Sequence, residues 1–389
     1  MVHNYYQQPG GEDRVASAEA ELLQNNGHEV LWYTKHNDAI ENMNALSVAT
    51  ATIWNRESYN KLYKIIKNES PDVVHFHNTF PLISPAGYYA AKNNRVAVVQ
   101  TLHNYRLFCP AGTLFRNGNV CEDCMGKAIA WPGVRHACYR ESRAATAVVA
   151  AMLSSHRLLR TWQRKVDLYI AISEFARQKF IEAGLSPEKI VVKPNFIEPD
   201  PGPGNERDDY ALFVGRLSRE KGIDTLLAAW EKLDGSVNLK IVGDGPLAAK
   251  VRDQAARLPS VEALGRMDRD GVMALMGATN FLIFPSEPYE TFGLVAVEAC
   301  ARETPVIVSR LGAMSEIIRD RDTGLHFEAG NAEDLATTVR WAVGHPAEIR
   351  QMGKAARKEY LKNYTGRRNY QLLTGIYEQA IEETKIERR

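Results

Sequence analysis

Short, β-branched apolar runs alternate with longer amphipathic segments along most of this 389-residue chain. Because these runs are continuous rather than alternating between apolar and polar residues, they predict buried parallel strands joined by helices. The predicted strands of the first half are residues 30–33, 72–76, 96–102, 168–172 and 190–192. Those of the second half are residues 210–214, 239–242, 261–264, 281–284 and 305–308. The alternation predicts an α/β protein with two doubly wound domains.

A proline- and glycine-rich segment separates the two halves. Residues 193–205 hold four prolines and two glycines in 13 residues, which favours neither a helix nor a central strand. We therefore expect an N-terminal domain at 1–194, a hinge at 195–205 and a C-terminal domain at 206–365. A final helix at 366–389 is expected to pack back toward the N-terminal domain. The first strand looks clipped, since only MVHNYY precedes the first glycines, so either the natural start lies further upstream or the strand is short.

The overall composition is that of an ordinary globular protein. With 48 Lys plus Arg against 47 Asp plus Glu, and 45% hydrophobic residues, no polycation for nucleic acid and no long disordered region is expected. No secretory signal precedes residue 14, which predicts a cytoplasmic protein. The most apolar window, residues 144–153, is ten residues long and too short to span a bilayer.

A basic segment surrounds that window. Residues 135–165 contain seven Lys or Arg against the single Glu141. Such a segment either rests on an anionic membrane surface, where it could collect a lipid-linked acceptor, or is a core helix with a solvated basic end. The sequence leaves both interpretations open.

Two basic residues follow the first strand of the second half. The strand at 210–214 runs into GRLSREKG, in which Arg216 and Lys221 can both reach over the strand end. Ligands of open α/β sheets bind beyond the carboxyl ends of the strands, and two cations beside a glycine turn could hold a diphosphate. The alternative is a solvated, charged loop.

The segment PSEPYETFGLVAVEAC carries two glutamates eight residues apart. At about 100° per residue they cannot share one helix face, so Glu290 is expected in the loop and Glu298 about a turn inside a helix. Carboxylates at these two places could bind sugar and ribose hydroxyls. The backbone N–H groups that would point at an anion near the helix start are those of Thr291, Phe292, Gly293 and Leu294. The alternative is a capping glutamate plus a surface one.

GRLSREKG, the GDGP at 243–246 and PYETFGLVAVEA together resemble the retaining nucleotide-sugar glycosyltransferases of glycosyltransferase family 4. That family has the GT-B fold, in which two Rossmann-like domains face each other across a cleft. PGGEDR at 9–14 looks like the family's glycine loop, and LHNY at 102–105 like its strand-end histidine. A narrower likeness, carried by LHNYRLFCP, is to bacterial exopolysaccharide and capsule transferases.

The resemblance implies a set of residue roles. Arg216 and Lys221 would neutralise the donor diphosphate, and His103 would stand beside the anomeric carbon. The other implied donor contacts are Gly11 at the phosphates, Arg266 and Met267 near the nucleobase, Glu290 with the amides of 291–294 at the sugar, and Glu298 at the ribose. Asn104 and His77 are expected at the acceptor.

The implied activity is transfer of a sugar from a nucleotide diphosphate donor, expected to be UDP-linked, to a glycan or lipid-linked hydroxyl with retention. A nucleotide-sugar 2-epimerase of the same fold and a non-catalytic nucleotide-binding protein are the alternatives.

No cofactor or metal ion is expected to be required for catalysis. Asp268 with Asp270, and Asp320 with Asp322, are interpreted as cap and turn residues rather than metal ligands. His75 and His77 lie on one strand face, and a loop histidine with a buried neighbour is favoured over a metal pair. The spacing of Cys109, Cys121, Cys124 and Cys138 allows a structural zinc site, with free thiols as the alternative.

Overall fold

The computed structural model describes residues 1–8, 10–204 and 207–386. Of the segments interpreted above, residues 9, 205, 206 and 387–389 therefore lie outside the described residues. The chain divides into two compact units. The first unit comprises Met1–Leu114, Cys121–Pro194 and the segment from Asn369 onward, and the second comprises Phe115–Val120 and Asn195–Arg368.

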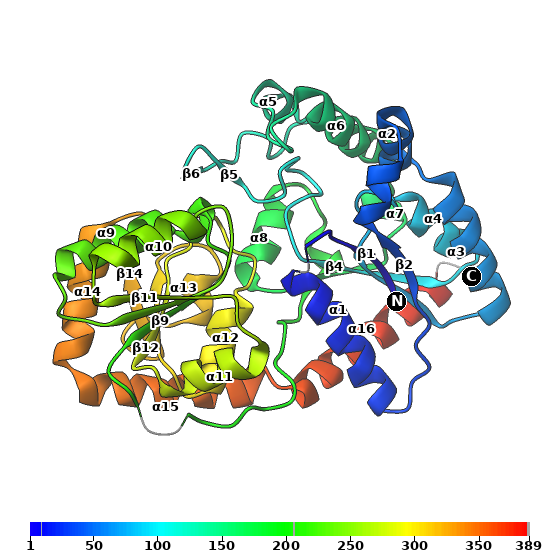
Figure 1. The fold of residues 1–389 in the computed structure, drawn as a ribbon. Helices are drawn as coiled ribbons and strands as arrows, with labels where there is room; N and C mark the ends of the chain where they lie inside the picture. Colours follow the sequence, from blue (N-terminus) through cyan, green and yellow to red (C-terminus); the bar gives the residue numbers. More distant parts are fainter. Residues whose placement is uncertain (9, 205–206, 387–389) are drawn as a thin grey trace. The chain divides into compact units, whose positions relative to one another are not determined.

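The first unit is built on a parallel sheet that has, within the described residues, six strands in the order β2-β1-β3-β4-β7-β8 (Figure 1). Its strands are β1 (Val2–Tyr5), β2 (Tyr33–His36), β3 (Val73–Asn78), β4 (Ala97–Leu102), β7 (Leu168–Ala171) and β8 (Ile190–Val192). Since β1 pairs with both β2 and β3, the short first strand is a central strand of the sheet. The strand order reverses beside β1, which makes the loops after β1 and β3 the natural binding edge.

Helices cover both faces of this sheet. They are α1 (Gly11–Asn25), η1 (Asn37–Asn42), α2 (Ala45–Ile53), α3 (Arg56–Glu69), α4 (Ala86–Asn93), α5 (Trp131–Arg135), α6 (Arg143–Leu158), α7 (Thr161–Arg164), α8 (Glu174–Glu182), η2 (Pro187–Lys189) and α16 (Gly366–Ile386). On one face, Leu23 of α1 and Leu373 of α16 share a core cluster with Val99 of β4. On the other face, Tyr88 of α4 packs edge-to-face on Phe76 of β3, with ring centroids 4.8 Å apart. The last helix is thus part of the first unit's core.

One predicted strand of the first unit is displaced. Residues 30–33 were predicted to form it, whereas β2 begins only at Tyr33. The ladder with β1 places the start of β2, because Val2, the first residue of β1, pairs with Tyr33. Val30 instead packs against the core cluster under the sheet.

The second unit repeats the architecture, with the described strands in the order β11-β10-β9-β12-β13-β14. They are β9 (Ala211–Val214), β10 (Leu239–Val242), β11 (Val261–Gly265), β12 (Phe281–Phe284), β13 (Val306–Ser309) and β14 (Gly324–Phe327). Numbered along this unit the order is 3-2-1-4-5-6, that of a dinucleotide-binding sheet, and it reverses between β9 and β12. Strand β14 was not predicted, and a turn was expected at the position where it begins. The strand is four residues long and contains a histidine, so its apolar run is too short to stand out.

Helices also cover the second sheet. They are η3 (Arg219–Lys221), α9 (Ile223–Leu233), α10 (Ala248–Arg257), α11 (Arg269–Ala278), α12 (Leu294–Ala301), α13 (Met314–Ile317), α14 (Ala332–Gly344) and α15 (Pro346–Asn363). The fully buried Trp230 of α9 lies in one core cluster with Phe213, Ile241 and Leu335. This unit also includes a small antiparallel hairpin of β5 (Phe115–Arg116) and β6 (Asn119–Val120).

The apolar window at 144–153 forms part of α6. One face of α6, with Val149, Met152 and Leu153, is buried in the first unit, while its ends carry exposed basic residues. No described helix combines the length and the apolar character needed to cross a bilayer.

Candidate active site

Two loops meet at the point where the strand order of the second unit reverses. The loop of residues 215–222 follows β9, and the loop of residues 285–293 follows β12. The Glu287 N–H donates to the Glu220 carbonyl at 3.0 Å, and the Ser286 hydroxyl oxygen lies 3.3 Å from the same carbonyl oxygen. Close backbone contact at Gly222, where φ is +70°, permits this junction. The two loops are therefore held as one structure.

Lys221 and Glu290 form an ion pair across these loops. The Lys221 Nζ lies 2.5 Å from Glu290 Oε1, and the Ser286 hydroxyl donates to the same carboxylate oxygen at 2.5 Å. Burial opposes ionisation of Glu290, but the Lys221 ammonium and the two hydrogen bonds outweigh it and hold the pKa of Glu290 below its usual value. The pair is thus charged at neutral pH, with both groups partly open to solvent.

Arg216 stands at the end of β9 with an exposed side chain. Its position depends on a tight approach of the next loop, since a Cβ on Gly243 would lie 1.8 Å from the Gly215 carbonyl oxygen. The φ of Gly243 is +147°, so a side chain there is excluded on both grounds. The glycines of GDGP therefore support the position of the Arg216 loop.

The helix predicted after Glu290 is α12, and Gly293 caps its start with a φ of +97°. Glu298 lies inside α12 and is only 4% exposed, while Glu290 lies in the preceding loop. Phe292 is a buried core residue that packs edge-to-face on Tyr364, with ring centroids 5.9 Å apart. Any contact of Phe292 with a ligand therefore involves its backbone.

Arg266 and Met267 follow β11, the outermost strand on this side of the sheet. Both side chains are exposed at the carboxyl end of the sheet. They stand two strands away from β9, so the predicted nucleobase contacts share an edge with Arg216 but not a loop.

In the first unit, the loop after β1 is anchored by Asp13. One Asp13 oxygen accepts a hydrogen bond from the Gly10 N–H at 2.7 Å, and the other lies 2.7 Å from Nε2 of the buried His3. Gly10 caps α1, and Gly11 is the first residue of the helix and is exposed. The Asp13 side chain thus fixes the backbone of Gly10 at the start of α1.

Asn104 connects the loop after β4 to the first turn of α1. Its side-chain amide donates to Glu12 at 3.2 Å and accepts a hydrogen bond from the Arg106 N–H at 3.1 Å. Burial raises the pKa of Glu12 to about 7, although hydrogen bonds from Tyr6 and Asn104 act in the opposite direction. Glu12 is therefore a carboxyl group that titrates near neutral pH beside a predicted acceptor residue.

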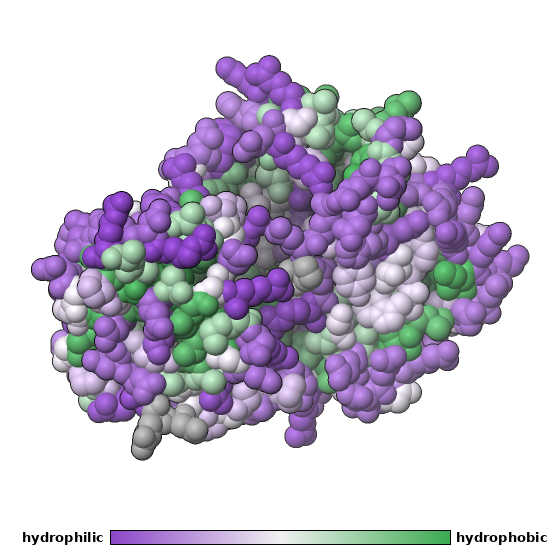
Figure 2. Space-filling view, in the orientation of Figure 1, coloured by the Kyte–Doolittle hydropathy of each residue, from purple (hydrophilic) through white to green (hydrophobic). Residues whose placement is uncertain are grey.

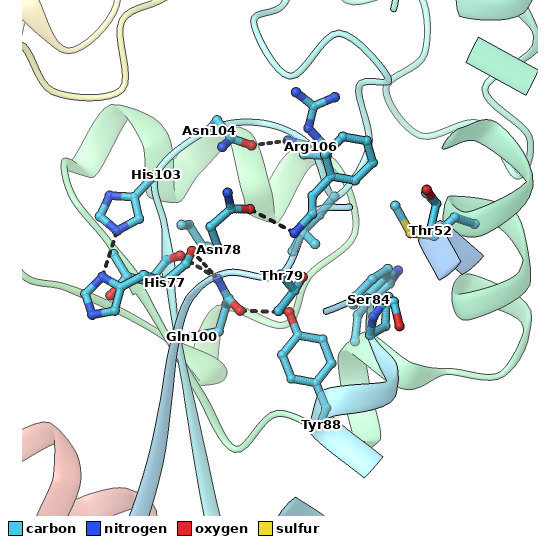
Figure 3. Close-up of a pocket in the computed structure, with 17 residues that line it drawn as sticks. Thr52, His77, Asn78, Thr79, Ser84, Tyr88, Gln100, His103, Asn104 and Arg106 are labelled. Carbon is cyan, nitrogen blue, oxygen red and sulfur yellow. Dashed lines mark hydrogen bonds between the residues drawn. The ribbon is translucent and has the colours of Figure 1, made fainter. Parts of the chain in front are cut away.

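His103 follows β4 and contacts His77, with His77 Nδ1 and His103 Nε2 3.0 Å apart (Figure 3). The prediction of a loop histidine at position 75 or 77 is wrong, because both residues lie within β3 and are buried. Strand β3 extends further than its apolar run. Burial, followed by the nearby positive charge of His3 and Lys193, lowers the pKa of His103 to about 3.

A cavity of about 50 Å³ adjoins these histidines. Its lining includes His77, His103, Asn104 and Arg106, and the Tyr88 hydroxyl donates to Gln100 there at 2.7 Å (Figure 3). That volume has room for a few water molecules but not for a sugar ring. A sugar would therefore have to bind outside it, against its mouth.

Two buried charged residues near this site were not recognised in the sequence. Glu19 of α1 and Lys193, which follows β8, form an ion pair with no exposed side-chain surface. Glu19 falls on the same helix face as Val15 and Leu23, which are buried. A charged residue on an apolar face is the one signal that could have found it.

The predicted cap and turn aspartates are confirmed. Asp268 accepts a hydrogen bond from the Gly271 N–H at 2.8 Å as the N-cap of α11. Asp320 accepts from the His326 N–H at 2.9 Å, and Asp322 pairs with Arg319 at 2.7 Å.

The four cysteines of the 109–138 loop are not paired in disulfides. Burial raises the pKa of the Cys124 thiol to about 11, and the nearby Cys109, Cys138 and Cys121 add to this. Among the described residues, the group with metal-ligand spacing consists of Glu19, His75 and His77 and includes none of these thiols. The thiols lie near one another but not in a closed metal-binding set.

The basic loop of residues 215–222 and the start of α12 lie where the strand order of a doubly wound sheet reverses. This arrangement defines a nucleotide-binding class of α/β protein. Comparison with known families agrees. Residues 9–201 match the model described as Glycosyltransferase Family 4, and residues 197–359 match Glycosyl transferases group 1. Together these matches cover most of the chain, and the protein belongs to the glycosyltransferases of this family. The predicted family is confirmed.

Curated relatives match over part of their length. An uncharacterized glycosyltransferase of Methanocaldococcus jannaschii, MJ1178, is 34% identical over 178 residues, which is 45% of this chain and 50% of the relative. Glycogen synthase of Mycobacterium tuberculosis is 32% identical over 159 residues, which is 39% of this chain and 38% of the relative. The chain thus spans about half or less of the length of these relatives.

Solved structures match the whole chain. A glycosyltransferase from Rickettsia africae has a TM-score of 0.69 at 19% identity, covering 98% of both chains. Anabaena HepE in complex with UDP and glucose has a TM-score of 0.67 at 17% identity, covering 96% of this chain and 98% of that one. At these identities the likeness concerns the fold, and the predicted GT-B fold is confirmed.

Proposed function

We propose that this protein transfers a sugar from a UDP-sugar donor to a hydroxyl group of a glycan or lipid-linked oligosaccharide in polysaccharide biosynthesis. The observation that carries the proposal is the ion pair of Lys221 and Glu290, held at the reversal point of the second sheet beside the start of α12. The pair offers a cation for a phosphate and a carboxylate for sugar hydroxyls within one rigid junction.

Charge stabilisation is the main catalytic effect in this proposal. As the glycosidic bond to the diphosphate breaks, negative charge grows on the leaving group, and Lys221, Arg216 and the first amides of α12 stabilise it. Because the protein supplies these cations, the reaction is proposed to need no metal ion. Retention at the anomeric carbon is part of the proposal and rests on the family resemblance.

The first unit is proposed to bind the acceptor and the second to bind the donor. Glu298 would hold the ribose, His103 would stand beside the anomeric carbon, and Asn104 would meet the acceptor. Residues 195–205 are proposed as the hinge, whose closure would expel water and suppress donor hydrolysis. The choice of UDP is supported by HepE, a protein of the same fold that was solved with UDP-glucose.

A donor screen tests the proposal. Purified protein is incubated with a panel of UDP-, GDP-, ADP- and dTDP-sugars and with simple glycan acceptors, and release of the free nucleotide is measured. Release of UDP that depends on the acceptor is the expected result. NMR of the product anomeric proton then decides between retention and inversion.

Two alternatives give different outcomes in the same screen. A nucleotide-sugar 2-epimerase would convert the donor alone into an isomer with the nucleotide still attached. A non-catalytic binding protein would bind nucleotide but release none with any acceptor.

Contact with the cytoplasmic face of a membrane is also proposed. Hydrophobic side chains gather over α2 and α6 (Figure 2), and Leu46 and Leu158 are 75% and 85% exposed. Basic residues at the ends of α6, including Arg143 and Arg160, would complement anionic lipid. Flotation with vesicles containing phosphatidylglycerol tests this, and Leu46→Ser with Leu158→Ser should abolish co-flotation.

A structural zinc ion remains a proposal as well. Cys109, Cys121, Cys124 and Cys138 are near neighbours, but they would have to move together to form a tetrahedral site. Native mass spectrometry of freshly purified protein decides the question. A mass without bound zinc removes the proposal.

A further inference from the structure

A chain of four polar side chains, three of them buried and the fourth, His103, partly buried, crosses the first unit beneath the predicted acceptor edge. It runs from Lys193 through Glu19 and His77 to His103, which come from the end of β8, from α1, from β3 and from the loop after β4. Lys193 and Glu19 are completely buried, and a buried ion pair adds little stability compared with apolar residues of similar size. Stability alone therefore does not explain the presence of this buried ion pair.

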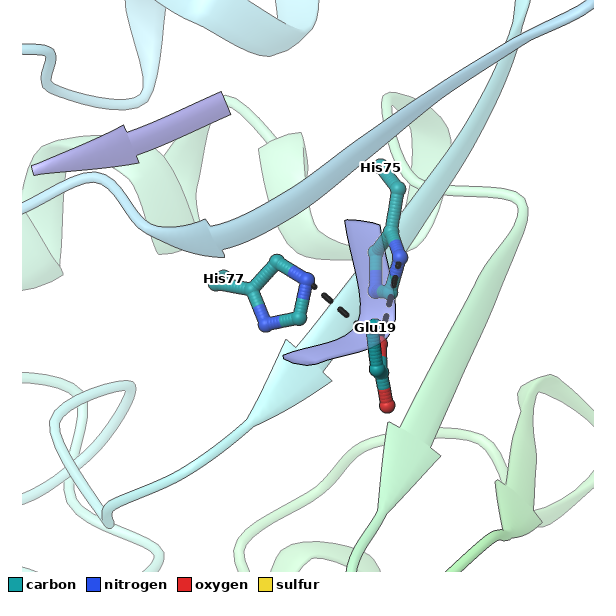
Figure 4. Close-up of side chains that lie close together, drawn as sticks. All are labelled: Glu19, His75 and His77. Atoms are coloured by element: carbon teal, nitrogen blue, oxygen red, sulfur yellow. Dashed lines mark ion pairs between the residues drawn. The ribbon is translucent and has the colours of Figure 1, made fainter. Parts of the chain in front are cut away.

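The contacts along this chain are direct. Lys193 Nζ contacts Glu19 Oε1, and the other carboxylate oxygen of Glu19 lies 3.5 Å from Nε2 of His77 (Figure 4). Within the described residues, these last two atoms are buried and make no other hydrogen bond. These two atoms lie closer to each other than Glu19 Oε2 lies to His75 Nδ1, which is 3.9 Å away and already contacts the Tyr377 hydroxyl. The second nitrogen of His77, Nδ1, lies 3.0 Å from His103 Nε2.

This geometry fixes where the imidazole protons lie. Burial and neighbouring positive charges lower the pKa of His77 and of His103, so both rings are neutral and each carries a single N–H. A lone pair on His77 Nε2 would face a carboxylate oxygen, which is repulsive, so the proton lies on Nε2. His77 Nδ1 must then accept a hydrogen bond, and the donor is His103 Nε2–H.

We propose that Glu19 and His77 are positioning residues that hold His103 in the tautomer with its lone pair on Nδ1. The inference rests on the proposed function, in which His103 stands beside the transferred sugar. In this tautomer Nδ1 accepts a hydrogen bond from a sugar hydroxyl, whereas the opposite tautomer would present an N–H to a carbon that gains positive charge. Lys193 acts one step further back by binding one oxygen of Glu19 and thereby fixing the carboxylate plane.

The same residues could instead hold a metal ion, since Glu19, His75 and His77 lie within ligand distance of one another. The other contacts of this group favour the positioning role. Lys193 already supplies a positive charge to Glu19, and the two nitrogens of His75 lie 2.8 Å from the Tyr377 hydroxyl and 2.8 Å from the Thr101 hydroxyl. The carboxylate thus already has a cation on its other oxygen, and both nitrogens of His75 already have hydroxyl partners.

Glu19→Gln is the discriminating substitution. The Lys193 ammonium binds the glutamine oxygen, so the glutamine NH₂ group must turn toward His77 Nε2. Donor and acceptor then exchange in the hydrogen bond at His77 Nε2 and in the hydrogen bond between His77 and His103. His103 is left protonated on Nδ1. In the double variant Glu19→Gln/Lys193→Met, no ammonium claims the glutamine oxygen, which can turn back to His77 and restore the original tautomer.

The tautomer is read directly by ¹⁵N NMR of histidine-labelled protein, with the His103 signals assigned by their loss in His103→Gln. We expect a pyridine-type Nδ1 on His103 in the wild type and in the double variant, and a pyridine-type Nε2 in Glu19→Gln. A wild-type His103 that is protonated on Nδ1 overturns the proposal even if no variant folds. Histidine chemical shifts that stay unchanged after prolonged dialysis against EDTA exclude a bound metal ion. Shifts that change after dialysis support a metal ion and contradict the positioning role.

Activity gives the second measurement. Glu19→Gln should lower kcat by about tenfold, the value of one hydrogen bond, with little change in the KM for the donor, and the double variant should recover. His75→Gln is the matched control, because it disturbs the same buried cluster without touching His103 and should leave kcat near that of the wild type. Loss of kcat without recovery in a folded double variant would overturn the proposal. Failure of the wild type to turn over any nucleotide sugar would instead reject the proposed function, and the NMR result would still stand.

Discussion

Gly222 and Pro285 touch through their backbones at the junction of the loops that follow β9 and β12. A Cβ built on Gly222 would lie 1.9 Å from the Pro285 carbonyl oxygen, at a φ of +70°. The contact joins the loop that carries Lys221 to the loop that carries Glu290, so the ion pair depends on the absence of a side chain at this position.

Gly222→Ala should therefore be strongly destabilising. We expect a loss of about 3 kcal/mol or more in the free energy of unfolding, because a steric clash with backbone adds to the cost of positive φ. Gly235→Ala is the matched control, with a φ of +77° and no atom within 4 Å of the added Cβ, and should cost only about 1 kcal/mol. Urea unfolding of both variants measures the difference, and equal losses would show that the loop contact is not rigid.

Lys221→Met should reduce turnover much more than donor affinity. The substitution keeps the aliphatic stem and removes the charge that would stabilise the leaving diphosphate, so we expect kcat to fall by about 10²- to 10³-fold. Lys250→Met is the control, because Lys250 forms an exposed pair with Asp224 at 2.5 Å in the same unit. Steady-state kinetics with the best donor separates kcat from KM. A Lys221→Met enzyme with normal kcat would remove Lys221 from the proposed mechanism.

Glu298→Ala should weaken donor binding by roughly 10- to 150-fold, which corresponds to the loss of a charged hydrogen-bonding partner of the ribose. Glu298 is buried in α12, so circular dichroism must first show that the variant is folded. Isothermal titration with UDP gives the affinity, and Glu333→Ala, at an exposed position of the same unit, serves as the control. An unchanged affinity for UDP in the folded variant would argue against the ribose role.

Glu12→Gln should stabilise the protein above neutral pH and have little effect at pH 5. The folded-state pKa of Glu12 is raised from 4.5 to about 7, so between these values the folded state binds a proton that the unfolded state has released. Stability from this group therefore falls as the pH rises through that window and is constant above it. Linkage gives about 3 kcal/mol as the upper limit, and partial exposure of the side chain reduces it.

The measurement compares the free energies of unfolding of wild type and Glu12→Gln at pH 5 and pH 8. Glu21→Gln, an exposed substitution on the same helix, controls for the general effect of removing a negative charge from α1. If the two variants respond equally to pH, burial of Glu12 is not what raises its pKa.

The parts of the fold that the sequence predicts are those that local chemistry determines. Strands β9, β10, β12 and β13 are short, mainly apolar runs, and residue type predicts their bounds to within one residue. The position of β2 could not be predicted in the same way, because pairing with β1 sets its register and that contact is not local. Strand β14 was missed for a similar reason, since its four residues form a strand only where β13 pairs with them.

The residues of the candidate site also fall into those that local sequence predicts and those that it does not. Lys221 and Glu290 could be chosen from the sequence because each follows a strand at the binding edge and belongs to a recognisable motif. Glu19 and Lys193 could not, because their partnership joins positions 174 residues apart and only the folded chain brings them together. Lys193 nevertheless adds to the effect of the histidines' own burial in lowering the pKa of His77 and of His103.

The participation of α16 in the core of the first unit has a consequence for synthesis. Leu373, Ile376 and Ala380 cover apolar positions of β7 and β4, which are synthesised about 200 and about 275 residues earlier. The N-terminal sheet must therefore wait, with one face incompletely covered, until the entire second unit has been translated. A fragment that stops at residue 194 should consequently bind chaperones or aggregate, and adding residues 366–389 as a separate peptide should restore its solubility.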